Sequence, residues 1–98
     1  MIDARTASRK RRATIDRRVA LFDSRLLARC FQYEVDVDAG ELFVRHPDKV
    51  EPVAVVDLVT MQLTSADELY RAGAALVVEH VRRAEKLGAR SKRETRYE

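Results

Sequence analysis

FQYEVDVDAGELFVR, residues 31–45, is the stretch that decides the fold. From Phe31 to Val37 apolar and polar side chains alternate strictly, which is the period-2 pattern of a strand with one buried face. The turn follows at residues 38–40, where Gly40 can take the left-handed conformation that a three-residue hairpin loop with a bulge requires. Leu42 to Arg45 returns as the second strand. The segment therefore predicts an antiparallel β-hairpin.

A third strand is expected after the proline-containing loop that runs from His46 to Pro52. Eight of the eleven residues from Val53 to Leu63 are apolar and five are β-branched, which favours a strand buried on both faces over a helix. Asp57 is the one ionisable residue in this run. The sheet is therefore expected to have three strands.

A helix is expected before the hairpin. Thr14 can cap its start, and Ile15, Val19, Phe22 and Leu26 recur at spacings of four, three and four, which places them on one helix face. The apolar run is short, so a strand over residues 19–22 stays an alternative.

A second helix is expected after the third strand. Ser65 and Glu68 have the spacing of a capping box, and Gly88 has the position of a helix stop. Gly73 suggests that another backbone packs closely against this helix. The expected buried stripe consists of Leu69, Gly73, Leu76, Val77, His80, Val81, Ala84 and Leu87.

These elements predict an α+β fold with the order α-β-β-β-α. Two helices on one face of a three-stranded antiparallel sheet form a two-layer sandwich. Residues 14–88 would make one domain, between a disordered basic arm at residues 1–13 and a charged tail at residues 89–98. A core this small is marginal for a monomer, so a homodimer is expected.

The charges are strongly segregated along the chain. Residues 1–18 hold seven basic and two acidic residues, residues 19–81 hold five and eleven, and residues 82–98 hold seven and three. Basic ends around an acidic body indicate a polyanion as partner. Because the basic segments contain few aromatic side chains, contact with phosphates is expected rather than stacking on bases.

Catalytic and metal chemistry find little support in the sequence. Cys30 is the only cysteine and is expected to be a small core residue, while His46 and His80 lie on different elements. Residues 36–40 resemble the start of a calcium loop, but Gly40 falls at the fifth position where such a loop needs its glycine at the sixth. We therefore expect no enzyme activity, no metal and no cofactor.

The lone cysteine favours a reducing, cytoplasmic compartment, and the chain contains no apolar run long enough to span a membrane. Together with the charges, this predicts a small regulatory protein, of bacterial or phage type, that binds the backbone of DNA or RNA. The expected contact residues are Arg5, Arg9, Lys10, Arg11, Arg12, Arg17, Arg18, Arg90, Lys92, Arg93 and Arg96.

A protein-binding module of the antitoxin or inhibitor type is the alternative. Its working surface would be the acidic sheet face, where carboxylates would bind a basic partner. The expected residues are Glu34, Asp36, Asp38 and Glu41.

Overall fold

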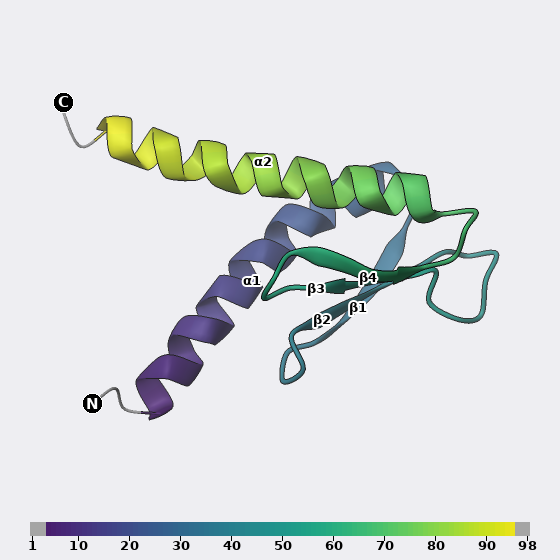
Figure 1. Cartoon of the computed structure of the whole chain (residues 1–98), viewed down its shortest axis with the longest axis horizontal. Coiled ribbons are helices and arrows are strands. Elements are labelled where there is room, and N and C mark those ends of the chain that lie inside the picture. The colour runs from purple at the N-terminus through teal and green to yellow at the C-terminus, as the bar shows by residue number, and fades with distance from the viewer. Residues whose placement is uncertain (1–3, 96–98) are drawn as a thin grey trace.

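The computed structural model describes the backbone of residues 4–95 and the side chains of residues 9–88. The elements are α1 (Ala4–Ala28), β1 (Gln32–Asp36), β2 (Glu41–Arg45), β3 (Ala54–Asp57), β4 (Gln62–Ala66) and α2 (Arg71–Thr95). All strand pairs are antiparallel and the order in the sheet is β1-β2-β3-β4. Both helices lie on the same side of this sheet (Figure 1). The α+β class is confirmed, and the expected number of strands is wrong by one.

The additional strand arises because the apolar run from Val53 to Leu63 folds back on itself. One carboxylate oxygen of Asp57 accepts hydrogen bonds from the backbone amides of Val59 and Thr60, at 2.8 and 3.1 Å. Met61 takes a φ of 60°, and its amide donates to the Asp57 carbonyl at 2.8 Å. Asp57 therefore organises a tight turn, and a single long strand was the wrong interpretation.

The first hairpin, β1–β2, has the same turn design. The Gly40 amide donates to the Asp36 carbonyl at 2.9 Å, the Ala39 amide donates to the Asp36 carboxylate at 3.1 Å, and Gly40 has a φ of 69°. The left-handed conformation expected of Gly40 is confirmed. The Leu58 amide also donates to the Gly40 carbonyl at 2.8 Å, so the two turns are tied together.

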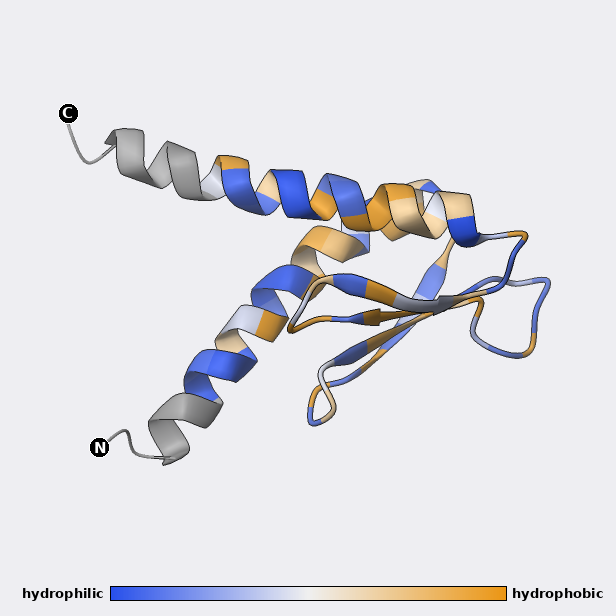
Figure 2. Cartoon of the chain, in the orientation of Figure 1, coloured by the Kyte–Doolittle hydropathy of each residue, from blue (hydrophilic) through white to orange (hydrophobic). Residues whose placement is uncertain are grey.

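The sheet has one buried face, as the alternation predicted. Leu42 and Val44 of β2 and Val56 of β3 are at most 1% exposed, whereas Phe43, between the first two, is half-buried on the other face. Ile15, Phe22 and Leu26 of α1 cover the buried face together with α2. Where the helices and the sheet meet, their residues are mainly hydrophobic, and hydrophilic residues increase toward the helix ends (Figure 2).

Helix α1 starts ten residues before the predicted cap. Thr14 lies inside the helix, where its hydroxyl donates to the Lys10 carbonyl at 3.0 Å, so it is not an N-cap. Residues 4–13, which the sequence predicted to be disordered, are helical because alanine, arginine and lysine all have high helix propensity.

The end of α1 is a Schellman motif. The amides of Cys30 and Phe31 donate to the carbonyls of Leu27 and Leu26 at 3.0 and 2.9 Å. Cys30 has a φ of 64° and an exposed side chain, so the expectation that it is a core residue is wrong.

Helix α2 begins later and ends later than expected. Ser65 lies in β4, and the chain turns instead at Asp67, whose carboxylate accepts from the Leu69 amide at 3.0 Å. Gly88 does not stop the helix, which continues through Thr95 because good helix formers follow it. The predicted tail at residues 89–98 is thus helical as far as Thr95.

The buried stripe of α2 also differs from the prediction. Ala74, Val77, Val78 and Val81 pack on the core, whereas Leu76 is 43% exposed. The other stripe residues that the structure exposes are Leu69, His80 and Leu87. A Cβ at Gly73 would lie 3.8 Å from side-chain atoms of Arg29 and Phe31, an ordinary contact, so Gly73 does not mark a close backbone approach.

Candidate nucleic-acid interface

Helix α1 presents five of the eleven predicted cations to solvent. Among its described side chains, four consecutive basic residues and one more than a turn later are exposed: Arg9, Lys10, Arg11, Arg12 and Arg17. Within the described side chains, only Arg11 of these five has a polar partner, since its guanidinium donates to the Asp38 carbonyl at 3.3 Å. The side chain of Arg5 lies outside the described residues. The exposed cations of α1 are therefore available to an anionic ligand.

Arg18 has a structural role instead. Its Nε and Nη2 donate to the two carboxylate oxygens of Glu85 at 2.9 and 3.2 Å, and Nη1 donates to the carbonyls of Leu58 and Val59 at 2.6 and 2.8 Å. Its side chain is only 17% exposed. This guanidinium joins α1, α2 and the β3–β4 turn, so we remove Arg18 from the set of ligand-binding residues.

A small hollow lies between α1 and the β3–β4 turn. It has a volume of about 320 Å³, and Lys10 and Arg11 line it beside Leu58 and Val59. The hollow combines two cationic groups with an apolar wall, which suits a phosphate and its neighbouring sugar.

Helix α2 adds cations that are not among the predicted contact residues. Arg82, Arg83 and Lys86 are exposed and line a groove of about 630 Å³ between α2 and β4. The sequence feature that could have identified them is the spacing of Arg82, Lys86 and Arg90. These residues recur every four positions and so share a helix face. The side chains of Arg90, Lys92 and Arg93 lie outside the described residues, as does all of Arg96.

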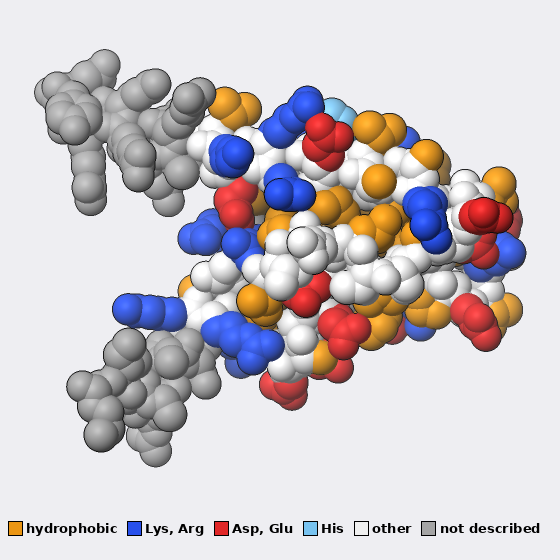
Figure 3. Space-filling view, viewed as in Figure 1, with side chains coloured by type: hydrophobic (Ala, Val, Ile, Leu, Met, Phe, Trp, Pro, Cys, Tyr) orange, Lys and Arg blue, Asp and Glu red, His pale blue; other side chains and the backbone are white. Residues whose placement is uncertain are grey.

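The two groups of cations lie at the same end of the molecule. The N-terminal end of α1 and the C-terminal end of α2 diverge on one side of the sheet (Figure 1). Lysine and arginine side chains gather there on both helices in the space-filling view (Figure 3). We call this surface the basic fork and define it as Arg9, Lys10, Arg11, Arg12, Arg17, Arg82, Arg83 and Lys86.

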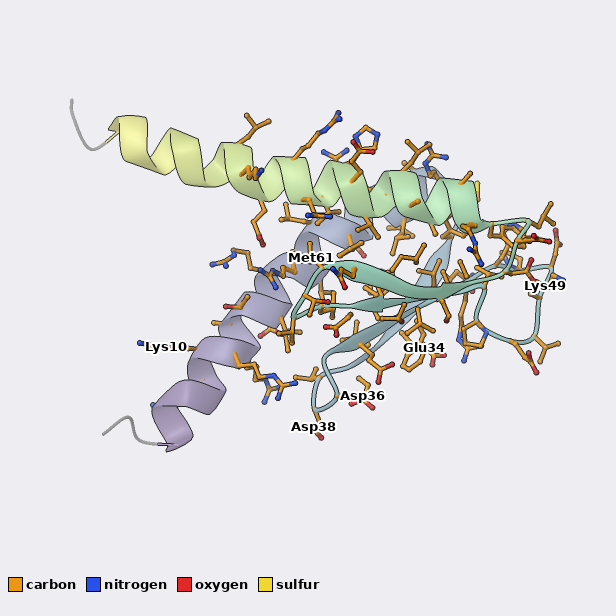
Figure 4. All side chains as sticks on the ribbon, in the orientation of Figure 1. Lys10, Glu34, Asp36, Asp38, Lys49 and Met61 are labelled. Atoms are coloured by element: carbon orange, nitrogen blue, oxygen red, sulfur yellow. The ribbon has the colours of Figure 1, made fainter. Side chains whose placement is uncertain are left out.

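The predicted acidic residues lie together on the β1–β2 hairpin. Asp36 and Glu41 are directly opposite each other at the end of the two strands, and Asp38 lies on the turn between them. Glu34 lies further along β1, where its carboxylate is 3.1 Å from Nε of Arg45. Glu34, Asp36 and Asp38 follow one another down the hairpin, while Lys10 lies across from them on α1 (Figure 4).

Two ionisable side chains have shifted pKa values. Hydrogen bonds from the backbone amides of Thr60 and Val59 lower the pKa of Asp57. Burial opposes this effect, and the Thr60 side chain and nearby Arg11 lower the pKa further. A hydrogen bond to Asp23, at 2.6 Å, raises the pKa of Tyr33, with burial and the Asp23 charge adding to it. Both shifts have structural causes, in a turn and in the contact of α1 with β1.

The histidine predicted to lie in a loop has structural contacts. His46 packs 4.9 Å from the ring centroid of Tyr70, whose hydroxyl lies 3.3 Å from Nδ1 of His46. His80 is exposed on α2. No group of three or more histidine, cysteine or acidic side chains among the described residues has the arrangement of a metal site.

Comparison with known proteins finds no matching family model, no matching curated protein and no matching solved structure. Over the described residues, no helix is both long enough and apolar enough to cross a membrane. The basic fork is therefore judged on its geometry and charge alone.

Proposed function

We propose that this protein binds the phosphate backbone of nucleic acid through the basic fork, as a small regulatory protein. The observation that carries the proposal is that exposed cations of two helices, far apart in the sequence, lie at one end of the molecule. Four of the five α1 cations in the basic fork have no polar partner within the described side chains, so phosphates would meet free charges.

Charge segregation supports the proposal and indicates which side of the molecule would face the nucleic acid. The carboxylates of Asp36, Asp38 and Glu41 cluster on the β1–β2 hairpin, so a polyanion approaching from that side would be repelled. Binding should be strongly salt-dependent, because each phosphate contact releases condensed counterions. It should depend little on base sequence, because the described part of the fork contains no aromatic side chain for stacking.

The test is the salt dependence of binding to a labelled DNA duplex. If about five cations each neutralise one phosphate, the slope of log K against log salt is expected to be roughly −4 to −5. Replacing Arg9, Lys10, Arg12 and Arg17 with alanine should make the slope shallower by about 3 to 4 units and weaken binding similarly on unrelated sequences. The side chains of these four residues make no polar contact in the described structure, so the fold should survive.

Lys49 is the matched control, because it lies at the opposite end of the molecule from Lys10 (Figure 4). Lys49→Ala should leave the slope unchanged, whereas Lys10→Ala should reduce its magnitude by roughly one unit. Absence of salt-sensitive binding to DNA or RNA at low ionic strength would refute the proposal, and so would equal effects of the two variants.

Protein binding through the acidic hairpin is the second candidate. The observation that favours it is that Asp36 and Glu41 face each other across the strand pair, a like-charge arrangement that a basic partner would relieve. Under this candidate, Asp36→Asn with Glu41→Gln abolishes partner binding, and the four α1 substitutions leave it intact. The homodimer stays a prediction, for which sedimentation equilibrium is the direct test.

A further inference from the structure

The groove between α2 and β4 has a volume and an apolar lining that contact with phosphates alone would not need. It has a volume of about 630 Å³, which is within the range of about 300 to 1,000 Å³ typical of sites for small organic molecules. Met61, Leu63 and Val78 supply apolar lining, and Ala75 is an exposed small residue on the helix wall. The groove can therefore receive part of a ligand between helix and sheet.

The charges of the groove select an anion. Arg82 and Lys86 have no ion-pair partner within the described part of the chain, and Glu79, the one acid that lines the groove, is paired with Arg83 at 2.7 Å. The spacing of these cations continues in the sequence with Arg90 and Arg93. An anionic polymer lying along α2 would thus meet a cation on successive turns.

The edge of the sheet at this groove suits a polar ligand better than an added peptide strand. β4 is the last strand, so its outer edge has no partner within the described residues. The register shift between Val55 and Val56 marks a bulge in the β3–β4 pairing, and bulges make an edge a poor template for another strand. Gln62, at the start of β4, lines the groove, is exposed and offers both a donor and an acceptor.

We propose that this groove holds one single strand of nucleic acid, with phosphates on Arg82 and Lys86 and with sugars and bases against Met61, Leu63 and Ala75. The proposal rests on the proposed function and specifies its substrate: a duplex keeps its bases stacked inside and cannot insert them between α2 and β4. Since no aromatic side chain lines the groove, it should accept any base.

The test places a carboxylate in the groove and a matched one outside it. Ala75→Glu adds a negative charge at an exposed helix position that lines the groove, and Ala72→Glu makes the same change three residues earlier, at an exposed position that does not line it. Both variants keep a good helix former, and thermal unfolding followed by circular dichroism checks that each is folded. The probes are fluorescein-labelled oligo(dT), oligo(U) of the same length, and a DNA duplex of that length, in binding titrations at low salt.

Ala75→Glu should weaken binding of both single strands about tenfold while changing duplex binding by less than about twofold, and Ala72→Glu should change neither much. Arg82→Ala combined with Lys86→Ala should reproduce the greater loss on single strands. If the wild type binds all probes and Ala75→Glu weakens them equally, the groove proposal fails and the basic fork stands. If the wild type binds no probe, both proposals fail together.

Discussion

Single residues account for the shape of three connections in this fold, α1–β1, β1–β2 and β3–β4. Asp36 and Asp57 each use one side-chain oxygen to accept backbone amides two or three residues ahead, and the residue four positions on, Gly40 or Met61, takes a left-handed conformation. Cys30 takes the same conformation at the end of α1. Only one of these three left-handed positions is glycine, so two carry a conformational cost.

The Cys30→Gly variant should therefore be more stable than the wild type by about 0.5 to 1 kcal/mol. Glycine adopts a φ of 64° without the clash of a Cβ, and the exposed thiol contributes no core packing. Urea unfolding followed by circular dichroism measures the difference. The control is Ala28→Gly, at the last residue of α1, which should lower stability by about 0.5 to 1 kcal/mol. Equal losses in both variants would contradict the role assigned to Cys30.

Asp57 predicts a pH dependence with a defined sign. Its pKa is lowered in the folded protein from the ordinary value of 3.8, so the fold favours the charged carboxylate. This contribution to stability is present above about pH 4 and is lost as the pH falls through the lower, folded pKa. The free energy of unfolding of the wild type should exceed that of Asp57→Asn at pH 7, and the difference should shrink steadily below pH 4. A difference that grows on acidification would rule this out.

At the scale of elements, the phase of α2 differs most from what the sequence pattern indicated. The stripe that packs on the core runs through Ala74, Val77, Val78 and Val81. The predicted stripe shared Val77 and Val81 with it, but also included Leu76 and Leu87, which are exposed. Both stripes fit helical spacing, so the sequence pattern alone does not decide between them. The sheet selects the first because the turn at Asp67 places the start of the helix at Arg71 and so fixes its rotation.

Two neighbouring residues test this phase. Val77→Ala should lower the free energy of unfolding by about 2 kcal/mol because Val77 is only 2% exposed, and lost methyl groups leave a cavity. Leu76→Ala removes a larger group yet should cost about 1 kcal/mol or less, since Leu76 is 43% exposed. Chemical unfolding of both variants shows which substitution lowers the free energy of unfolding more. A greater loss for Leu76→Ala would mean that Leu76 faces the core.

At the scale of the whole molecule, the sequence predicted what depends on local alternation and failed where several local solutions compete. The β1–β2 hairpin is confirmed because its strict alternation has one interpretation. The α1 face of Ile15, Phe22 and Leu26 is also confirmed, and the alternative of a strand over residues 19–22 is wrong. The fourth strand was missed because an aspartate inside an apolar run gave no sign of which backbone amides it would bind. The predicted cap at Ser65 failed because strand pairing with Val55 occupies that residue.

Only part of the candidate site was predicted, because its other part depends on contacts between residues far apart in the sequence. Charge counting identified the cations of α1, but it could not show that Arg18 is taken up by Glu85, a contact between residues 67 positions apart. Nor could it show that Arg82 and Lys86 flank a groove, because that groove exists only where α2 passes over β4. Such pairings depend on how helices cross the sheet, which one-dimensional spacing does not encode.

The common location of both helix ends has a practical consequence for labelling. The first turn of α1 and the last turn of α2 lie beside the basic fork (Figure 1), so a fluorophore placed on either of them would crowd the surface under study. The loop between β2 and β3 lies at the far end, and Val50 there is 92% exposed. A Cys30→Gly, Val50→Cys double variant would offer one reactive thiol for a dye placed well away from any bound strand.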